Sequence, residues 1–265
     1  MTTNPPEPKR PDYGLDAPGV VRNLFLAGGL GWALFASGAL GLWPGAALNA
    51  LLSWTGLGFA VSFTLTGLWM VWHSKVGKFH GRERLLDRIA WRGDETALDV
   101  GCGRGLLLVA AARRLPRGKA VGIDVWQAED LTGNRPEATL ENACLEGVAD
   151  RVEVRTADMR ELPFPDGSFD VVVSNVAIHN LYQPAERERA IAEIARVLKP
   201  GGQALINDIR HGDEYAAAFP KHGCADVRCL GSRWASLAVA LFTFGSLRPA
   251  TLLARKPSAT STASI

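Results

Sequence analysis

The sequence predicts an α/β fold in which a doubly wound, mostly parallel sheet follows two helices that cross a membrane. Three observations support this prediction. A glycine-rich turn at 101–105 joins an apolar strand to an apolar helix. Further apolar runs alternate with helical segments, the pattern of a parallel sheet with helices on both faces. The stretch between Arg22 and Lys75 contains no Asp, Glu, Lys or Arg, which is typical of membrane spans.

The N-terminal part of the chain divides into a tail and an apolar hairpin. Residues 1–22 are polar and rich in proline, and they predict a disordered tail. A helix needs about 20 mainly apolar residues to cross a bilayer. The uncharged stretch divides at Trp43-Pro44-Gly45, a turn-forming tripeptide, into two runs of about that length. We therefore predict a transmembrane hairpin over 23–72, with spans at 24–42 and 48–72.

The flanking charges predict the orientation of this hairpin. Positive residues lie on both flanks and none lies in the connecting turn, so both termini and the following domain are expected in the cytoplasm. These residues are Lys9, Arg10, Arg22, Lys75, Lys78, Arg82, Arg84, Arg88 and Arg92. The cluster over 75–92 is expected to contact anionic lipid. Two alternatives remain: a helical hairpin buried in a soluble protein, and a signal peptide, which the long proline-rich lead and the second run disfavour.

A helix over 81–89 is expected to lead into the sheet. Five apolar strands then alternate with helices, and two further strands follow at 226–230 and 250–254. The five strands lie near 97–100, 119–123, 152–156, 169–175 and 202–208. The domain so formed covers 73–256, and the Ser/Thr-rich residues 257–265 are expected to be disordered.

An apolar run at 234–244 lies between the last two strands and is too short to span a membrane. It fits three roles. The run either docks on a membrane, lines a substrate entrance, or forms a helix that covers the edge of the sheet.

The glycine-rich turn predicts a nucleotide site. Glycines allow positive φ and close approach of a ligand, while the following helix presents unpaired N–H groups. Asp124 ends the second apolar run, where a carboxylate can accept hydrogen bonds from both hydroxyls of a ribose. A dinucleotide fingerprint would place a further glycine at position 106, which is Leu106 here. A nicotinamide-dependent oxidoreductase is therefore disfavoured.

Four segments in order resemble class I S-adenosylmethionine-dependent methyltransferases, of the methyltransferase type 11 kind. Asp99-x-Gly101-x-Gly103-x-Gly105 is similar to their first motif, and 156–159 is similar to their adenine-contacting segment. The stretches 162–175 and 195–206 resemble their fourth-strand and Pro-Gly-Gly motifs. The resemblance covers roughly residues 75 to 256. It implies a seven-stranded, Rossmann-like methyltransferase sheet with an antiparallel last strand, and S-adenosyl-L-methionine as cofactor.

The resemblance also implies roles for individual residues. Gly101, Gly103 and Gly105 would pass close to the methionine part of the cofactor, and Asp99 would anchor that loop or bind the amino group. Asp124 would bind the ribose. The other residues implied at the cofactor site are Val125, Trp126, Asp158, Met159 and Asn175. Asp158 would bind the adenine amino group. Met159, Val125 and Trp126 would pack near the ring.

The acceptor side is predicted from position and chemistry. The segments 175–180 and 208–211 leave the carboxyl ends of the fourth and fifth strands, the edge where doubly wound sheets bind ligands. His179 and His211 are candidate general bases, because imidazole titrates near neutral pH. The Pro-Pro-aromatic motif of enzymes that methylate exocyclic amines does not occur at 174–177.

These features together predict a membrane-anchored methyltransferase acting on a small-molecule or lipid-phase acceptor. The alternative is a membrane protein that binds S-adenosylmethionine without turnover, as a sensor or assembly partner. The four cysteines form no Cys-x-x-Cys pair, and neither a disulfide framework nor a metal site is expected. A net charge of +2 does not single out nucleic acid as a partner. The sequence leaves the acceptor and the oligomeric state open.

Overall fold

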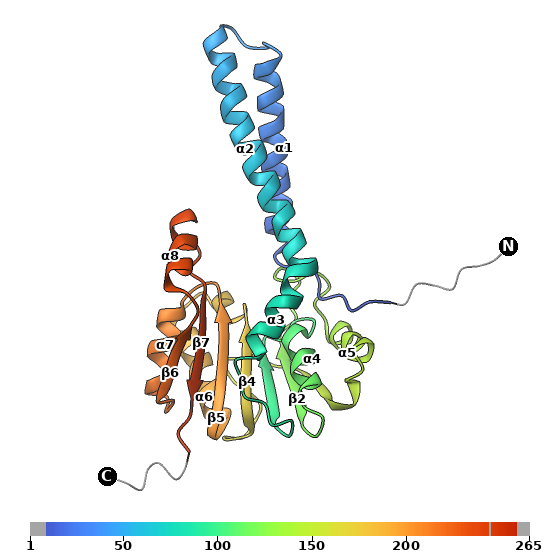
Figure 1. Cartoon of the computed structure of the whole chain (residues 1–265), viewed down its shortest axis with the longest axis vertical. Helices are drawn as coiled ribbons and strands as arrows, with labels where there is room; N and C mark the ends of the chain where they lie inside the picture. The colour runs from blue at the N-terminus through green and yellow to red at the C-terminus, as the bar shows by residue number, and fades with distance from the viewer. Residues whose placement is uncertain (1–8, 244, 259–265) are drawn as a thin grey trace, which may run out of the picture. The chain divides into compact units, whose positions relative to one another are not determined.

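The computed structural model describes residues 9–243 and 245–258, and it divides into two compact units (Figure 1). The hairpin unit comprises 12–81 and 127–134. The sheet unit comprises 82–126 and the chain from 135 onward, together with the segment before residue 12.

The sheet unit is built on a seven-stranded sheet with the order β3-β2-β1-β4-β5-β7-β6. β1 to β5 are parallel, β7 is antiparallel to β5, and β6 is antiparallel to β7. The strands are β1 (Thr96–Val100), β2 (Lys119–Asp124), β3 (Val152–Thr156), β4 (Phe169–Asn175), β5 (Leu198–Asp208), β6 (Asp226–Leu230) and β7 (Ala250–Arg255). The predicted sheet, with its antiparallel last strand, is confirmed.

Helices cover both faces of this sheet (Figure 1). They are α4 (Leu106–Arg113), α5 (Pro136–Leu145), α6 (Pro184–Val197) and α7 (Gly212–Lys221), with short 3₁₀ turns η2 (Ala149–Arg151) and η3 (Ile178–Asn180). Successive β1 residues point to opposite faces. Leu98 therefore packs with the α6 side chains Ile191 and Ile194, whereas Ala97 packs with Leu108 of α4. Both faces of β1 are buried, so its carboxyl end is a rigid platform for the loop that follows.

β5 begins earlier than predicted, at Leu198 rather than at residue 202. Leu198 pairs with Phe169 of β4 before the chain passes through Pro200 and Gly201, and the register shifts between these pairings. The turn residues that marked a strand start in the sequence are therefore an irregularity inside a longer strand.

The hairpin unit contains α1 (Pro18–Ala39) and α2 (Ala46–Trp72), which lie side by side and antiparallel (Figure 1). α2 continues through a π-helical turn η1 (His73–Gly77) into α3 (Lys78–Leu86). Glycines allow close packing of α1 on α2. A Cβ on Gly31 would lie 2.5 Å from the Ala60 backbone nitrogen, and one on Gly56 would lie 2.4 Å from that of Phe35. A larger side chain at either glycine would push the helices apart.

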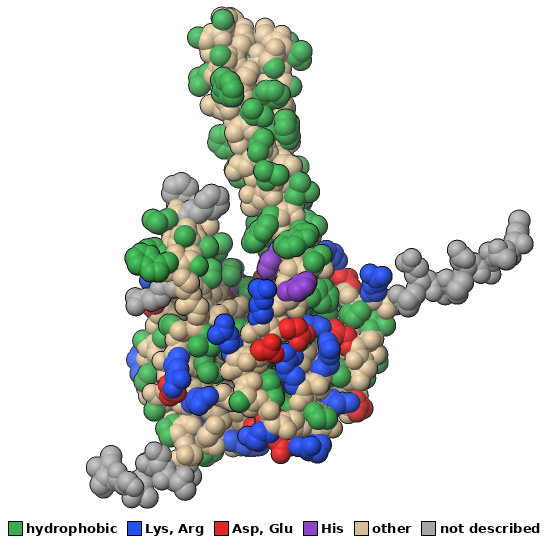
Figure 2. Space-filling model, in the orientation of Figure 1, with side chains coloured by type: hydrophobic (Ala, Val, Ile, Leu, Met, Phe, Trp, Pro, Cys, Tyr) green, Lys and Arg blue, Asp and Glu red, His purple; other side chains and the backbone are tan. Residues whose placement is uncertain are grey.

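Both helices are long and apolar enough to cross a membrane, by length and composition. Only 17% of the most hydrophobic window of each helix is buried. Figure 2 shows hydrophobic side chains along the hairpin. Trp54, which is 74% exposed, is the extreme case among the larger apolar residues of α2.

The segment before α1 is bound to the start of α3. The buried ammonium group of Lys78 donates hydrogen bonds to the carbonyl oxygens of Tyr13 (2.7 Å) and Gly14 (2.9 Å). It also forms an ion pair of 3.1 Å with the Asp16 carboxylate. The Ser74 hydroxyl donates to the other oxygen of Asp16 at 3.0 Å. Residues 13–16 are thus held by polar contacts from two helical residues, Ser74 and Lys78.

The loop 127–134 is bound to the same segment. Leu15 donates its N–H to the Thr132 hydroxyl at 2.7 Å, and Thr132 donates its N–H to the Leu15 carbonyl at 3.2 Å. Ala17 donates its N–H to the Asp130 carbonyl at 2.9 Å. This loop directly follows Trp126 and leads into α5, so a part of the hairpin unit is continuous in sequence with the end of β2.

These contacts differ from two expectations. Within the predicted disordered tail over 1–22, α1 begins at Pro18 and residues 12–17 make specific hydrogen bonds, while residues 1–8 lie outside the described part of the chain. Lys78 and Arg82 are each 6% exposed. The expectation that the cluster over 75–92 contacts anionic lipid is therefore wrong for these two residues. Arg82 instead makes a bidentate ion pair with the Glu146 carboxylate, with N···O distances of 2.9 and 3.0 Å. Charge counting in the sequence does not distinguish a buried cation from an exposed one.

Replacement of Lys78 by methionine should destabilise the base of the hairpin by about 1–3 kcal/mol, because two carbonyls and a carboxylate lose a charged donor. Amide hydrogen exchange at Leu15 and Thr132, measured by mass spectrometry or NMR, should accelerate. Lys75→Met is the matched control, since the Lys75–Asp12 pair is about half exposed on both sides and such pairs contribute little. Equal exchange in the two variants would contradict this role of Lys78.

Candidate functional site

The glycine loop after β1 is shaped by the fold. Gly101, Gly103 and Gly105 all have positive φ, at 74°, 51° and 87°. A Cβ on Gly101 would lie 2.3 Å from the Cβ of Ala177, in the segment after β4. The loop also donates two N–H groups, from Gly101 and Cys102, to the Ile123 carbonyl at 2.9 Å. The turn therefore brings the ends of β1, β2 and β4 together, and α4 begins directly after it.

Asp124 joins the glycine loop to the loop after β2. One carboxylate oxygen accepts the N–H of Gly103 at 2.8 Å, and the other accepts the N–H of Trp126 at 2.6 Å. Trp126 has φ 62°, an uncommon conformation for a residue other than glycine. Each carboxylate oxygen has two lone pairs, so a carboxylate that accepts backbone N–H groups can also accept hydrogen bonds from the hydroxyls of a ribose. Its predicted position beside the glycine loop fits a nucleoside cofactor.

Asp99 is buried beneath the glycine loop, 3% exposed. Burial and, to a smaller extent, the nearby charge of Asp124 raise the pKa of Asp99, the N–H of Leu108 lowers it, and together they give a pKa of about 8. Asp99 is thus protonated in the folded protein at neutral pH. Because its side chain points to the α4 face, it can anchor the loop, as one of its two predicted roles requires.

This protonation predicts a pH-dependent stability. Unfolded aspartate ionises near pH 4, whereas folded Asp99 ionises near pH 8. The folded protein binds the additional proton between these values, so the free energy of unfolding should fall as the pH rises through this window. Asp99→Asn should fall less steeply, as thermal unfolding at several pH values between 5 and 8.5 would show. Asp150→Asn, at a side chain that is 72% exposed, should keep the original slope; an unchanged slope in Asp99→Asn would contradict the assignment.

Met159 and Asp158, two of the residues predicted near adenine, have different surroundings in the structure. Met159 lies beside the glycine loop, because a Cβ on Gly101 would be 3.7 Å from its terminal methyl group. The Asp158 carboxylate, in contrast, is held by the guanidinium of Arg160 at 2.6 Å, which lowers the pKa of Asp158. Arg160 also pairs with Glu186, and these residues line a polar cavity of about 360 Å³. To contact adenine as predicted, the Asp158 carboxylate would have to accept a hydrogen bond from the base in addition to those from Arg160, or lose its ion pair with Arg160.

The remaining predicted cofactor residues lie at the carboxyl edge of the sheet. Val125 is half-exposed, and the Trp126 indole N–H donates to the Thr156 hydroxyl at 2.8 Å. The Asn175 side-chain oxygen accepts a hydrogen bond from the Asn207 amide at 2.8 Å. Asn175 thus makes a side-chain hydrogen bond across the paired strands β4 and β5, at the carboxyl edge of the sheet.

His179 forms a pair with a carboxylate that the sequence analysis did not single out. Its Nδ1 lies 2.7 Å from Oδ1 of Asp208, at the end of β5, although the contact is not well aligned as a hydrogen bond. Asp208 is buried and accepts the backbone N–H of His179 at 3.0 Å and that of Ile209 at 2.8 Å. The Tyr215 hydroxyl, 3.3 Å away, also donates to Asp208. The signal was present in the sequence, as an acidic residue that ends the fifth strand.

The segment that carries His179 is strained. Val176, the first residue after β4, has φ 52°, and a β-branched residue in this region is a genuine outlier. Its N–H donates to the Asn207 carbonyl at 2.8 Å, which helps to hold the conformation. Ala177, next in the chain, is the residue that contacts Gly101. The glycine loop and the His179 segment are therefore neighbours, as a donor site and an acceptor site must be.

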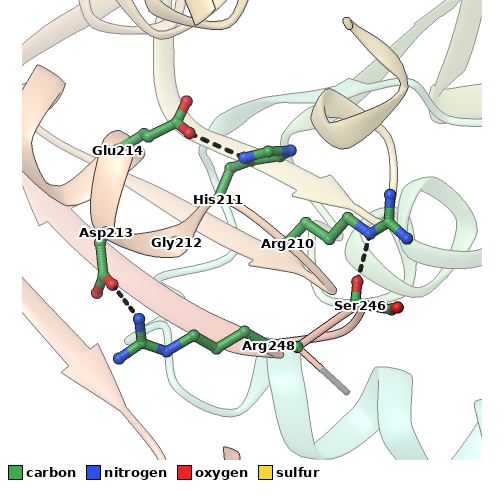
Figure 3. Close-up of a pocket in the computed structure, with 8 residues that line it drawn as sticks. Arg210, His211, Gly212, Asp213, Glu214, Ser246 and Arg248 are labelled. Atoms are coloured by element: carbon green, nitrogen blue, oxygen red, sulfur yellow. Dashed lines mark hydrogen bonds and ion pairs between the residues drawn. The ribbon is translucent and has the colours of Figure 1, made fainter. Parts of the chain in front are cut away.

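His211 lies in a separate setting, at the start of α7 with φ 60°. Its Nδ1 is 2.9 Å from the Glu214 carboxylate, as Figure 3 shows. Burial raises the pKa of Glu214, but hydrogen bonds from Arg187 and His211 outweigh this and lower it. The cavity around His211 measures about 420 Å³ and is lined by Arg210, Asp213, Ser246 and Arg248, among others. The two predicted histidines are thus paired with different carboxylates.

Within the described residues, no group of three or more His, Cys, Asp or Glu side chains is placed to hold a metal ion. All four cysteines are free, and Cys102 and Cys224 are buried. The donor set at the carboxyl edge consists of backbone N–H groups, carboxylates and imidazoles. This set suits a nucleoside cofactor and proton transfer.

Residues 98–206 match the family model for a methyltransferase domain. A demethylmenaquinone methyltransferase of Symbiobacterium thermophilum is 34% identical over 141 residues, which cover 52% of this chain and 49% of the relative. The 27-O-demethylrifamycin SV methyltransferase of Amycolatopsis mediterranei is 35% identical over 131 residues, covering 47% and 44%. The chain thus spans about half the length of the curated relatives it matches.

Solved structures share the fold. The geranyl diphosphate C-methyltransferase of Streptomyces coelicolor A3(2), determined with Mg²⁺, geranyl-S-thiolodiphosphate and S-adenosyl-L-homocysteine, superimposes with a TM-score of 0.52 at 19% identity. The match covers 67% of this chain and 75% of that one. A likeness at this identity concerns the arrangement of the sheet and helices.

Proposed function

We propose, from the premise that residues 98–206 form an S-adenosylmethionine-dependent methyltransferase domain, that the chain is a membrane-anchored enzyme. It transfers the methyl group to a small-molecule or lipid-phase acceptor. The observation that supports turnover is the contact between Gly101 and Ala177, which joins the cofactor loop to the segment carrying the His179–Asp208 pair.

The residues around the cofactor site have separable roles in this proposal. The bound cofactor supplies a methyl group on a positively charged sulfur. The glycine loop gives backbone N–H groups and a close approach, and Asp124 accepts hydrogen bonds from ribose hydroxyls. Asp99 stays protonated and supports the loop from below. Positioning of the acceptor against the methyl group is the main contribution that such a site makes to an in-line displacement.

His179 is the proposed general base. The Asp208 carboxylate lies 2.7 Å from Nδ1, so in this proposal Nε2 accepts a proton from a hydroxyl, phenol or protonated amine of the acceptor. A protein that only binds the cofactor would need no such pair, so this arrangement favours an enzyme over the sensor or assembly partner.

The membrane anchor is a proposal that rests on the hairpin. An apolar surface as open as that of α1 and α2 would be unfavourable in water unless a partner or a lipid phase covered it. Under the positive-inside rule, the flanking cations favour a cytoplasmic location for both termini and for the sheet unit. Extraction of membranes with alkaline carbonate should leave the full chain in the pellet, and release into the supernatant would contradict the anchor.

An anchored enzyme has access to acceptors dissolved in the bilayer. Relatives whose names specify demethylmenaquinone and a sterol support this class of acceptor, as does the open hairpin. The test is incubation of the purified chain with methyl-labelled S-adenosylmethionine and a membrane lipid extract. Label should enter the organic phase, and mass analysis should identify the methylated compound; the Asp124→Ala variant is the control. Absence of transfer to any lipid or polar extract would leave the binding protein as the better account.

A further inference from the structure

Helix α8 (Arg233–Phe242) presents an apolar stripe that the sheet does not cover. Trp234, Leu237 and Leu241 are 80%, 44% and 71% exposed. Their spacing of three and four residues puts them on one face of the helix. A helix that covered the edge of the sheet would bury this face. Over 234–243, the described part of the apolar run, the structure therefore contradicts the expected edge-covering helix; residue 244 lies outside the described residues. Figures 1 and 2 show α8 beside the ends of β6 and β7, with hydrophobic side chains on its surface.

The helix begins at the functional edge of the sheet. β6 and β5 both run antiparallel to β7, so the end of β6 lies at the same edge as the end of β5, which carries Asp208. The return loop after α8 is fastened to this edge as well. Arg248 donates its N–H to the Ile209 carbonyl at 2.8 Å, and the Arg210 guanidinium donates to the Ser246 carbonyl at 2.6 Å.

The charges around α8 suit an anionic surface. Asp226 is the last acidic residue of the chain, and the following residues carry only cations. Arg228 pairs with Asp226, and Arg248 pairs with Asp213. Arg210, in contrast, is exposed and makes its described contact with a neutral carbonyl group. An apolar face with an aromatic residue and no acidic residue is typical of helices that lie in the membrane interface.

We propose that α8 lies in the headgroup region of an anionic bilayer, with Trp234, Leu237 and Leu241 inserted toward the acyl chains. The proposal rests on the membrane anchor of the proposed function. Insertion of the two candidate spans confines the sheet unit near the bilayer, and this raises the effective concentration of a helix that would bind only weakly by itself. Docking of α8 would turn the edge with His179 and Asp208 toward the source of a lipid-phase acceptor.

The test places an environment-sensitive fluorophore on α8 in the full chain. Cys144 and Cys229 are exposed and are replaced by serine first, while the buried Cys102 and Cys224 remain. Leu237→Cys is then labelled and compared with Leu140→Cys on α5, a matched control because the two leucines are 44% and 41% exposed. Both proteins are reconstituted into vesicles of phosphatidylcholine with phosphatidylglycerol.

The label at position 237 should shift to shorter emission wavelengths in vesicles and should be quenched by lipids carrying a nitroxide. The label at position 140 should instead be quenched by aqueous iodide. The proposal is overturned if, in protein that stays in the membrane after carbonate extraction, the label at position 237 is quenched by iodide and not by the nitroxide lipids. Shielding from both quenchers, with cross-linking that rises with protein density, would overturn it in favour of a second copy of the chain.

Two further measurements distinguish failure of the proposed function from failure of the α8 proposal. Carbonate extraction reports the anchor, and calorimetry with S-adenosyl-L-homocysteine reports the cofactor site, each in the same labelled proteins. A protein that is anchored and binds the cofactor but has a water-exposed α8 contradicts only the docking of this helix. A protein released by carbonate contradicts the anchor itself, and the docking with it.

Discussion

Replacement of Asp124 by alanine is expected to weaken the affinity for S-adenosylmethionine and S-adenosyl-L-homocysteine by about 100-fold or more. A hydrogen bond to a charged group contributes about 1.5–3 kcal/mol, and a ribose offers two hydroxyls to this carboxylate. Since about 1.4 kcal/mol corresponds to a factor of ten, the loss of both bonds gives two orders of magnitude. The same substitution also removes the acceptor for the N–H groups of Gly103 and Trp126.

Isothermal titration calorimetry with S-adenosyl-L-homocysteine measures this effect directly. Asp124→Asn retains one acceptor oxygen and should lie between the alanine variant and the original protein. Asp150→Ala removes an exposed carboxylate at a side chain that is 72% exposed and should bind with unchanged affinity. Undiminished binding by Asp124→Ala would refute the position of the cofactor site. Because the glycine loop could loosen in this variant, its thermal unfolding is compared with that of the asparagine variant.

Replacement of His179 by alanine is expected to lower the rate of methyl transfer by about 10²- to 10⁴-fold, the usual range for a general base, while the cofactor affinity stays within about twofold. The acceptor is the one identified from the labelled extract. Single-turnover measurements separate the chemical step from product release. Asp208→Asn should lower the rate less, because the imidazole remains in place and loses only the carboxylate that faces Nδ1.

Two other histidines provide the controls for this prediction. His222→Ala removes a partly exposed imidazole near Glu188 and should leave the rate unchanged. His211→Ala distinguishes the two candidate bases, since His211 is paired with Glu214 rather than with Asp208. If His211→Ala is the slower variant and His179→Ala transfers at the original rate, the roles assigned to the two histidines are reversed. If neither variant is slower, positioning alone accounts for the reaction.

The cofactor side of the site could be predicted much further than the acceptor side. Gly101, Gly103 and Gly105 lie in one turn, where local geometry dictates which residue types fit, and Asp124 ends the next strand, where the family resemblance implied it. The structure brings them together as the motif implied. The binding roles of these residues remain predictions until the affinity is measured. Asp158 shows the limit of such a motif, because Arg160, two residues further on, takes up its carboxylate.

Pairings between distant segments could not be predicted in the same way. Asp208 lies 29 positions from His179 along the chain, and only the pairing of β4 with β5 places the two side chains together. Lys78 looked like an exposed cation next to a membrane span, yet it is buried against residues 13–16. The sequence shows that Asp208 and Lys78 are present, but it does not show which residues they contact in the folded protein.

The sequence by itself determined the order and nature of the strands, the glycine turn and the uncharged hairpin, because each depends on periodicity or on residues close together in the chain. The place of Asp124 followed from the family resemblance, which relates the ends of the first two strands. Tertiary structure decided the partner of His179, the fate of Lys78 and Arg82, and the exposure of the α8 stripe. Burial and ion pairing depend on which distant segments meet. A linear pattern gives the chemistry of a side chain, whereas its charge partner and its access to solvent are properties of the folded chain.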